Sequence, residues 1–402
     1  MRSVFATGRT RPRAWRITQL DSIVRFCEER ESEIADAIEA DLGRGRVEAW
    51  MTEVASSRME AVHTRKHLRR WMRSRPKPLP LNQMPAVAMV QPEPLGTVLV
   101  IGPWNYPVYL ILGPLVAAVA AGNTVVLKPS ELAPATARLL AELLPQYVDP
   151  EAIRVVEGDG AVTQELLAQG FDHALFTGGT EIGRKIMAGA APHLTPVTLE
   201  LGGKSPVVVD ETADIEIAAR RIAWTKLMNS GQTCIAPDHL FAHSSIRDDL
   251  VRRIGQAMSE FRAEEQGGQP IVNERQFRRL SDALDRTDGQ VVRGGHADSA
   301  TQSIEPAIVV DPSPVEPLMQ EEIFGPVLPV IGFDSLDEVI SRINAGEKPL
   351  AAYLFTTSRD ARRRFIAEVP AGGIVVNHLM MHVLVPGLPF GGVGASGMGA
   401  YH

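Results

Sequence analysis

The feature that most constrains the fold is a long uncharged stretch, which runs from Pro94 to Leu127 without an Asp, Glu, Lys or Arg. Apolarity over this length is typical of a membrane-spanning helix. The stretch is interrupted, however, by Gly102-Pro103 and Gly113-Pro114, and such pairs break a continuous helix. A buried βαβ unit has the same apolarity, because helices cover both faces of a parallel sheet. We therefore expect no membrane span, but a strand at 97–101, a helix at 108–121 and a strand at 124–127.

The alternation of strand-like and helix-like segments continues beyond this unit. Short apolar strands that alternate with helices are typical of a doubly wound parallel sheet. The pattern predicts helices at 134–144, 162–168 and 181–190, with strands at 153–156, 173–176 and 197–199. A second α/β region is expected to include a strand at 206–209, a helix at 215–228 and a strand near 374–376.

The segments before the uncharged stretch differ in character. Residues 18–76 have apolar side chains at three- and four-residue spacing, which predicts helices. Residues 76–95 contain six prolines. Because proline removes a ladder hydrogen bond, this part is expected to be extended or looped, with a short strand at 87–90. The 402 residues of the chain allow two or three domains.

Charge and cysteine content argue against several classes of protein. A net charge of −7 gives no field that would gather nucleic acid or anionic lipid. The basic residues from Arg65 to Lys77 fit a solvated helix face best, and salt-dependent nucleic-acid binding is the alternative. His63 and His67 have no third ligand, so no metal site is predicted. Two cysteines, Cys27 and Cys234, cannot form a metal knuckle and indicate a reducing, cytoplasmic setting.

Cys234 is the candidate nucleophile, because it follows the polar, glycine-containing run Asn-Ser-Gly-Gln-Thr at 229–233. A thiol attacks only as the thiolate, which exposed backbone amides stabilise. Cys27 lies in a helical pattern and reads as a core residue. A cysteine in a loop is nevertheless as often an inert buried thiol as a reactive one, so other residues must decide.

Two glycine-rich segments compete as phosphate sites. The segment from Gly392 to Gly397 matches G-x-G-x-x-G, but only five residues follow it and no helix is predicted there. The segment from Thr177 to Gly183 lacks this pattern, yet it joins a predicted strand to a predicted helix, where an anion binds best. Gly202-Gly203-Lys204-Ser205 has no leading glycine at Thr198, so a P-loop nucleotidase is not expected.

Seven segments together resemble the aldehyde dehydrogenase superfamily, in order and in spacing, over nearly the whole chain. The Ser-Gly-Gln-Thr-Cys and Lys-Pro-Ser-Glu pieces are most similar to its class 3 branch. The segments are Pro-Trp-Asn-Tyr-Pro at 103–107, Leu-Lys-Pro-Ser-Glu at 127–131, Phe-Thr-Gly-Gly-Thr at 176–180, Leu-Glu-Leu-Gly-Gly-Lys at 199–204, the Cys234 loop, Glu-Ile-Phe-Gly-Pro at 322–326 and Leu-Pro-Phe-Gly-Gly at 388–392.

The resemblance implies a catalytic role for three residues. Cys234 would attack the aldehyde carbonyl, and Asn105 would donate its side-chain amide to the oxyanion together with the Cys234 backbone N–H. Glu200 would be the general base that activates water. Taken singly, Asn105 reads as a turn residue and Glu200 as half of a strand-end salt bridge. Together with Cys234, the catalytic interpretation is favoured.

The resemblance also implies NAD as the cofactor, with NADP as the alternative. A carboxylate at Glu131 should accept both ribose hydroxyls and repel a 2′-phosphate, which favours NAD. The family commonly has Ser where this chain has Gly179, so only a backbone N–H remains there. The implied cofactor residues are Lys128 and Glu131 at the adenosine ribose, Trp104, Gly179 and Gly183 near the pyrophosphate, and Glu322 and Phe324 at the nicotinamide ribose and ring.

The substrate would be a neutral aliphatic or aromatic aldehyde, because the implied tunnel carries no positive group. No nucleic acid or membrane partner is expected. The tunnel residues are Tyr106, Tyr109, Met228, Thr233 and Ile235, with Met380, Met381 and His382 as further candidates.

The resulting fold class is α/β: a doubly wound parallel-sheet NAD-binding domain, a second α/β catalytic domain and a small β oligomerisation excursion. The NAD(P)-binding domain would comprise residues 1–77 and 98–202, and the catalytic domain residues 203–395. Residues 78–97 and 396–402 would form the oligomerisation segment of a homodimer, which is shorter at its C-terminal end than in relatives.

Two other functions remain open on sequence alone. One is transfer of the acyl group to coenzyme A, which needs no general base and is therefore disfavoured by Glu200. The other is a catalytically idle structural or binding protein on the same fold, which the three catalytic residues disfavour.

Overall fold

The computed structural model describes residues 1–262 and 269–401 and divides the chain into two compact units. Unit 1 comprises residues 1–41, 45–177 and 184–197, and unit 2 comprises residues 42–44, 178–183 and the described residues from 198 onward. The main division falls after Val197, within strand β7 (Val197–Glu200), whereas the sequence places the domain boundary after residue 202. The predicted domain roles stay a prediction.

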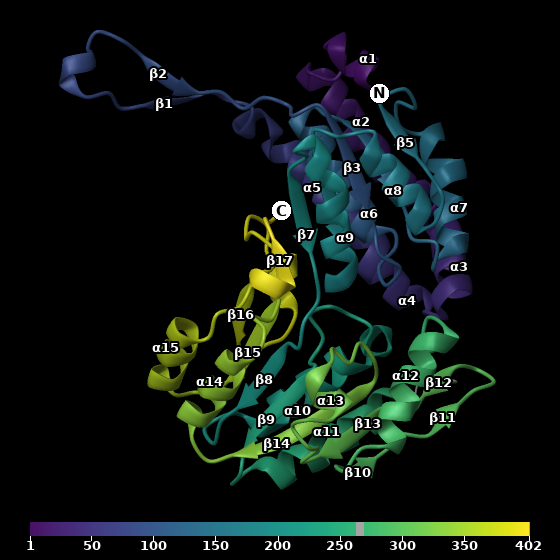
Figure 1. Ribbon diagram of the computed structural model, residues 1–402, viewed down its shortest axis with the longest axis vertical. Coiled ribbons are helices and arrows are strands. Elements are labelled where there is room, and N and C mark those ends of the chain that lie inside the picture. Colours follow the sequence, from purple (N-terminus) through teal and green to yellow (C-terminus); the bar gives the residue numbers. More distant parts are fainter. Residues whose placement is uncertain (263–268, 402) are drawn as a thin grey trace. The chain divides into compact units, whose positions relative to one another are not determined.

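The parallel sheet of unit 1 contains the predicted uncharged βαβ unit (Figure 1). Its strands are hydrogen-bonded in the order β6-β3-β4-β5. All five residues of β3 and of β4 are buried, because helices cover both faces and leave no solvent side to alternate with. The strands are β3 (Thr97–Ile101), β4 (Thr124–Lys128), β5 (Ile153–Val155) and β6 (His173–Thr177).

Helices follow these strands as predicted, with ends that differ by one or two residues. Helix α6 (Tyr109–Ala121) ends at Gly122, whose φ of 91° suits glycine. Among the described residues, no helix has both the length and the apolarity needed to cross a bilayer. The other helical elements before β7 are α1 (Arg2–Ala6), α2 (Arg13–Glu29), α3 (Glu31–Leu42), α4 (Arg46–Ala49), the π-helix η1 (Trp50–Val54), α5 (Ala55–Trp71), η2 (Leu81–Gln83), α7 (Pro134–Leu143), η3 (Leu144–Gln146), α8 (Gly160–Ala168), α9 (Thr180–Ala190) and η4 (Ala191–His193).

The N-terminus of α6 is capped by a residue distant in sequence. Its own N-cap residue, Val108, offers no side-chain acceptor. Glu53, in the π-helix η1, is 0% exposed, and its Oε2 accepts the backbone N–H groups of Val108 at 3.0 Å and Tyr109 at 2.8 Å. A carboxylate at this position satisfies orphan amides and complements the helix dipole.

We expect Glu53→Ala to lower the free energy of unfolding by about 2 kcal/mol, because it leaves two buried amides without their acceptor. Glu53→Gln keeps one acceptor oxygen and should cost about half as much. Urea denaturation followed by circular dichroism measures both. An alanine variant as stable as the wild type would show that Glu53 does not cap α6.

A small hairpin leaves the helices of unit 1 (Figure 1). Strands β1 (Arg75–Lys77) and β2 (Ala88–Val90) are antiparallel, with Arg75 opposite Val90, and η2 (Leu81–Gln83) lies between them. The strand predicted at 87–90 is confirmed, but its partner was missed because Pro76 lies inside it. Leu81 is 91% exposed. The oligomerisation role of this hairpin stays a prediction.

Unit 2 is built on a seven-stranded sheet in the order β10-β13-β14-β9-β8-β15-β16. All neighbouring pairs are parallel except β10 with β13. The strands are β8 (Pro206–Val209), β9 (His239–His243), β10 (Gln290–Arg293), β13 (Ala307–Val310), β14 (Val327–Phe333), β15 (Ala351–Phe355) and β16 (Gly373–Val376), and a separate hairpin is formed by β11 (Ala297–Asp298) and β12 (Ser303–Ile304).

Helices cover both faces of this sheet. On β8, Val207 and Val209 pack with α10 and α11, whereas Val208 packs with α14 and α15, as the two-residue strand period requires. The helical elements are α10 (Ile215–Leu227), η5 (Met228–Gly231), α11 (Arg247–Arg262), α12 (Glu274–Asp285), α13 (Pro317–Gln320), α14 (Leu336–Ala345), α15 (Arg359–Glu368), η6 (Met381–Leu384) and η7 (Gly394–Ser396). The predicted α/β fold class is confirmed.

Candidate active site

The Cys234 loop leaves α10 through a left-handed turn. Asn229, Ser230 and Gly231 have φ values of 51°, 52° and 71°. A Cβ on Gly231 would lie 2.3 Å from the backbone oxygen of Gly325, so only glycine fits there. The Asn229 Nδ2 donates to the Gln232 carbonyl at 3.0 Å, and the Gln232 Nε2 donates to the Asn229 carbonyl at 3.1 Å. These reciprocal bonds fix the backbone that leads into Cys234.

Cys234 lies half-buried near two carboxyl groups of unit 2. Burial, together with the nearby carboxyl groups of Glu322 and Glu200, raises the pKa of its thiol to about 12. A thiol in this setting is protonated at neutral pH, so it needs a proton acceptor before it can attack. The structure thus brings the predicted nucleophile, the predicted base and one predicted cofactor residue into electrostatic reach.

Glu200 ends strand β7 and is 3% exposed. Neither of its carboxylate oxygens has a hydrogen-bond partner among the described residues. Burial raises its pKa to about 8. Glu200 therefore forms no salt bridge with any of the described residues, in contrast to the alternative that its position at a strand end suggested. A buried carboxyl group without partners is costly, and such groups concentrate at functional sites.

Glu322 and Phe324 lie in the loop after α13. The Gly203 backbone donates a hydrogen bond to Glu322, and a Cβ on Gly202 would come within 2.3 Å of the Glu322 carboxylate, so a larger residue there would displace this carboxylate. Burial raises the pKa of Glu322 to about 7. Phe324 has a φ of 47°, which is rare for a bulky residue. This loop is held in a specific, strained shape.

Two residues that hold this loop were not predicted from the sequence. The Lys204 Nζ donates to the Asp238 Oδ1 at 2.5 Å and to the Glu321 carbonyl at 2.7 Å. The Asp238 Oδ2 accepts the Ile323 N–H at 2.8 Å. The pair therefore fixes the backbone on both sides of Glu322. In the sequence, Lys204 ends the Leu-Glu-Leu-Gly-Gly-Lys segment and Asp238 lies four residues after Cys234, but neither position indicates that the two residues form a pair.

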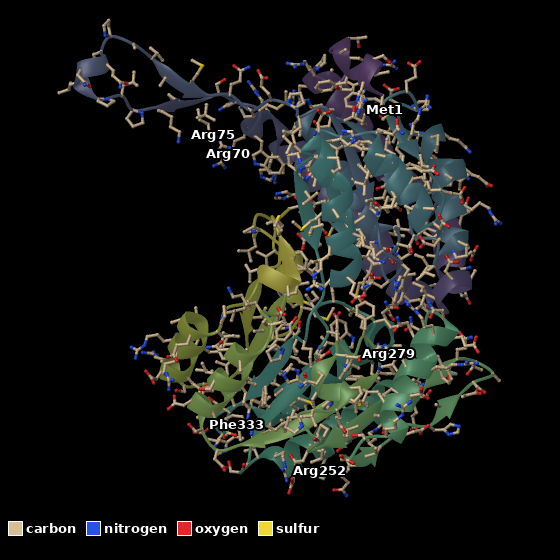
Figure 2. The ribbon with its side chains drawn as sticks, viewed as in Figure 1. Met1, Arg70, Arg75, Arg252, Arg279 and Phe333 are labelled. Atoms are coloured by element: carbon tan, nitrogen blue, oxygen red, sulfur yellow. The ribbon has the colours of Figure 1, made fainter. Side chains whose placement is uncertain are left out.

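Arg279 adds a third anchor from helix α12 (Figure 2). Its guanidinium donates to the Glu322 carbonyl at 3.2 Å and to the Ile323 carbonyl at 2.6 Å. Hydrogen bonds from a planar guanidinium fix the orientation of the accepting carbonyl groups as well as their position. The Glu322 loop is thus positioned by side chains from three separate elements.

The glycine segment at the start of α9 is open, as an anion site requires. A Cβ on Gly179 would meet no atom within 4 Å, and the buried Thr177 Oγ1 has no partner among the described residues. Gly183 instead packs closely, since its Cβ would lie 2.8 Å from Leu201. The structure thus shows a packing role for Gly183, and its cofactor role stays a prediction.

The G-x-G-x-x-G match near the C-terminus has a different use. It contains the three-residue helix η7 and ends at the first residue of the short strand β17 (Gly397–Met398), which pairs with β7. A Cβ on Gly392 would lie 2.0 Å from the Ser396 carbonyl oxygen. These glycines allow the chain to pack closely on itself.

The remaining catalytic and cofactor candidates belong to unit 1. Trp104, Asn105 and Tyr106 lie between β3 and α6, and the Asn105 side chain is buried. The buried Lys128 ends β4, and its Nζ lies 2.6 Å from the Oε2 of Glu131, a residue whose side chain is 47% exposed. A carboxylate held in this way remains free to accept hydrogen bonds on its exposed side.

The predicted tunnel residues lie in several segments. Tyr109 begins α6, while Met228, Thr233 and Ile235 belong to the Cys234 loop. Met380 is buried in a left-handed conformation with a φ of 62°. Next to Met381, the ring nitrogens of His382 have no partner among the described residues. Contact of these side chains with a substrate stays a prediction.

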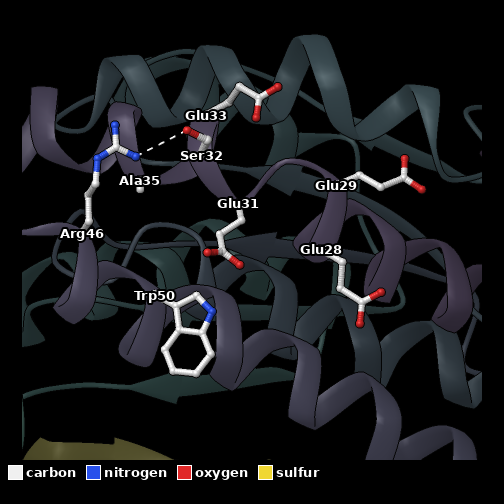
Figure 3. A pocket seen from close by; sticks show the side chains of 8 residues that line it. All are labelled: Glu28, Glu29, Glu31, Ser32, Glu33, Ala35, Arg46 and Trp50. Carbon is white, nitrogen blue, oxygen red and sulfur yellow. Dashed lines mark hydrogen bonds between the residues drawn. The ribbon is translucent and has the colours of Figure 1, made fainter.

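A pocket of about 360 Å³ in unit 1 has none of the candidate residues in its lining (Figure 3). It is lined by Trp50, Arg46 and a group of glutamates. Several of these carboxylates are already paired, as Glu28 is with Arg58 and Glu33 with Arg30. The pocket therefore does not compete with the Cys234 site.

Several solved structures with this fold are aldehyde dehydrogenases. A Staphylococcus aureus AldH in a substrate-bound state matches 100% of this chain and 88% of its own length, with a TM-score of 0.97 and 41% identity. Lactaldehyde dehydrogenase from Escherichia coli matches 97% of this chain and 83% of its own, with a TM-score of 0.87 and 29% identity. The fold is thus that of NAD(P)-dependent aldehyde dehydrogenases.

Comparison of sequences identifies the same family. The model of the aldehyde dehydrogenase family matches residues 2–402, and the chain belongs to this family. Mouse aldehyde dehydrogenase family 3 member A2 is 47% identical over 100% of this chain and 84% of the relative. The rat protein named aldehyde dehydrogenase, dimeric NADP-preferring, is 45% identical over 100% of this chain and 89% of the relative. The predicted family, enzyme class and use of NAD or NADP are confirmed.

Proposed function

We propose that the protein oxidises a neutral aldehyde to the free carboxylic acid through a covalent intermediate on Cys234. The observation that carries this proposal is Glu200: a buried carboxyl group without partners among the described residues, in electrostatic reach of the only cysteine that is not fully buried. A water-activating base is the part that hydrolysis of a thioester requires. Transfer to coenzyme A needs no such base.

In this mechanism, Cys234 adds to the carbonyl carbon to form a thiohemiacetal. Its proton must leave at or before attack, and a carboxylate in reach can take it. Asn105 and the Cys234 backbone N–H would donate hydrogen bonds to the oxyanion. These two donors would lower the barrier because they stabilise the negative charge that develops on the oxygen in the transition state. After the thioester forms, Glu200 would remove a proton from water as the water attacks the acyl carbon. The acid leaves and the thiol is regenerated.

The residues present fit a nicotinamide cofactor. The open Gly179 and the unpartnered Thr177 hydroxyl suit a pyrophosphate at the start of α9. Lys128 and Glu131 would hold the adenosine ribose, and Trp104 would lie near the pyrophosphate. Glu322 and Phe324 would contact the nicotinamide ribose and ring. When bound, the nicotinamide accepts a hydride from the substrate carbon.

The direct test is formation of reduced nicotinamide with a panel of neutral aliphatic and aromatic aldehydes, with NAD and with NADP. Chromatography of the products should show the free acid. If the product is an acyl-coenzyme A instead of the free acid, and forms only when coenzyme A is added, the acylating alternative is correct. If no aldehyde gives a signal with either nucleotide, the proposal fails in favour of a non-catalytic role.

We expect the wild type to have a lower KM for NAD than for NADP, because the Glu131 carboxylate repels a 2′-phosphate. Glu131→Gln should shift the ratio of the two KM values toward NADP by about tenfold, since it removes one unit of like charge at short range. Initial-rate kinetics with both nucleotides measure this shift. Glu142→Gln, which neutralises an exposed glutamate on α7, is the matched control and should leave the ratio unchanged. A wild type that clearly prefers NADP would contradict the assignment.

We further propose that the protein acts in the cytoplasm as a homodimer that uses the hairpin of β1 and β2. Its exposed apolar side chains support a contact surface, and the name of the rat relative describes that protein as dimeric. Sedimentation that shows only monomer would contradict the assembly, and fractionation of cells that finds the protein outside the cytosol would contradict the location.

A further inference from the structure

Tyr353 places one polar atom in the apolar core of unit 2. It lies in the middle of β15, between β8 and β16, and is 0% exposed. Its ring packs in the same hydrophobic cluster as Ile235 and Met380, and Cys234 packs against that cluster. A phenylalanine would fill the same space. The hydroxyl therefore needs an explanation, because burying it is favourable only if it is hydrogen-bonded.

The hydroxyl joins two loops that are far apart in the sequence. It donates to the Ile235 carbonyl at 2.6 Å, across a separation of 118 residues. It also accepts a hydrogen bond from the backbone of Met380. Ile235 directly follows Cys234, and Met380 is held in the left-handed conformation that a residue of its type rarely adopts. One oxygen atom thus fixes both the nucleophile loop and a strained turn.

The anchors of the nucleophile loop differ in rigidity. Before Cys234, the loop is held by bonds between Asn229 and Gln232 and by the bonds of Gln232 to the backbone of Pro270 and Val272, which lie in a loop segment. After Cys234, the Ser205 Oγ lies at the limiting distance of 3.5 Å from the Cys234 carbonyl oxygen. Tyr353 provides the shortest of these bonds, and it comes from a fully buried strand. The backbone after the cysteine therefore takes its position from the sheet.

We propose that Tyr353 is a positioning residue for the nucleophile: its hydroxyl holds the Ile235 carbonyl and the Met380 amide so that the Cys234 thiol is presented in one orientation. The inference rests on the proposed role of Cys234. Tyr353 touches neither the aldehyde nor the cofactor in this account. Without the hydroxyl, the two loops lose their common anchor, and displacement of a reacting atom by about 1 Å costs on the order of 10² in rate.

The test is Tyr353→Phe, followed by the pre-steady-state burst of reduced nicotinamide. The burst rate reports the chemical steps on Cys234, and the burst amplitude reports the fraction of molecules that are folded and competent. We expect the burst rate to fall about 10²-fold. The KM for NAD should change less than about twofold, because the cofactor residues are unaltered.

Tyr147→Phe is the matched control. This substitution also deletes one phenol hydroxyl with two hydrogen bonds, from the Arg30 Nε at 2.9 Å and to the Glu29 Oε2 at 2.9 Å, but in unit 1. Its burst rate should equal that of the wild type. The thermal unfolding midpoint of both variants shows whether each is folded at the assay temperature.

The outcomes are distinct. A Tyr353→Phe burst rate within threefold of wild type would overturn the inference, and so would a lower amplitude with an unchanged rate, which marks a purely structural role. If the wild type shows no burst because a step up to hydride transfer limits turnover, kcat itself should fall about 10²-fold in Tyr353→Phe, and a kcat within threefold of wild type would overturn the inference. Turnover by Cys234→Ala at the wild-type rate would remove the proposed role of Cys234 itself, and the inference with it.

Discussion

The Cys234→Ala variant is expected to form no reduced nicotinamide above background with any aldehyde that the wild type oxidises. No other side chain near Glu200 and Glu322 among those described supplies a thiol, because Cys27 is fully buried in unit 1. Removing the atom that forms the covalent bond should lower kcat/KM by at least about 10³-fold. Spectrophotometric assays at saturating nucleotide measure this loss.

The control for this variant is Cys27→Ala. Burial raises the pKa of the Cys27 thiol to about 12, and the side chain is 0% exposed, so it is an inert part of the core. Its removal should cost about 1 kcal/mol of stability through the small cavity it leaves, with kcat unchanged. If Cys234→Ala kept a tenth of the wild-type rate, the covalent mechanism would be wrong.

Much of the fold could be predicted from local pattern. Strands β3, β4, β6 and β8 are short apolar runs, so their positions agree with prediction to within about two residues, whereas β9, β14 and β15 of the second sheet were not predicted. Strand β1 could not be found in this way, because Pro76 and its neighbours read as a loop and only pairing with β2 makes them a strand. The π-helix that carries Glu53 has no sequence signature.

The site was predictable to the extent that its residues lie in compact motifs. Cys234, Glu200 and Glu322 come from three motifs of the resemblance, and the structure brings their side chains into electrostatic reach. The anchors were not predictable. Asp238 binds a backbone amide 85 residues away, and Tyr353 binds a carbonyl 118 residues away. A tyrosine within an apolar strand reads as core until its partner is known.

The Glu200→Gln variant is expected to give a burst of reduced nicotinamide and then to stall. Gln cannot accept a proton from water, so the thioester on Cys234 should form but not hydrolyse. Loss of a general base lowers the steady-state rate by about 10²- to 10⁴-fold. Stopped-flow absorbance resolves the burst, and mass spectrometry of the stalled protein should show the acyl group on Cys234.

Hydroxylamine provides the control for this stall. It attacks a thioester without the help of a base, forms the hydroxamate and releases the Cys234 thiol, so it should restore turnover in Glu200→Gln. Failure of hydroxylamine to restore turnover would place the defect before the thioester. In that case, Glu200 would act as the acceptor of the thiol proton rather than as the base for water.

The pH profile of the wild type tests the same assignment without a mutation. Burial raises the pKa of Glu200 to about 8, and the active form of a general base is the carboxylate. The rate of thioester hydrolysis should therefore rise about tenfold per pH unit below pH 8 and level off above it, because the ionised fraction follows this course. Glu200→Gln has no such group, so its residual hydrolysis should lack this inflection. A wild-type hydrolysis rate that is flat between pH 6 and 9 would exclude a base with this pKa, and the water-activating role of Glu200 would have to be abandoned.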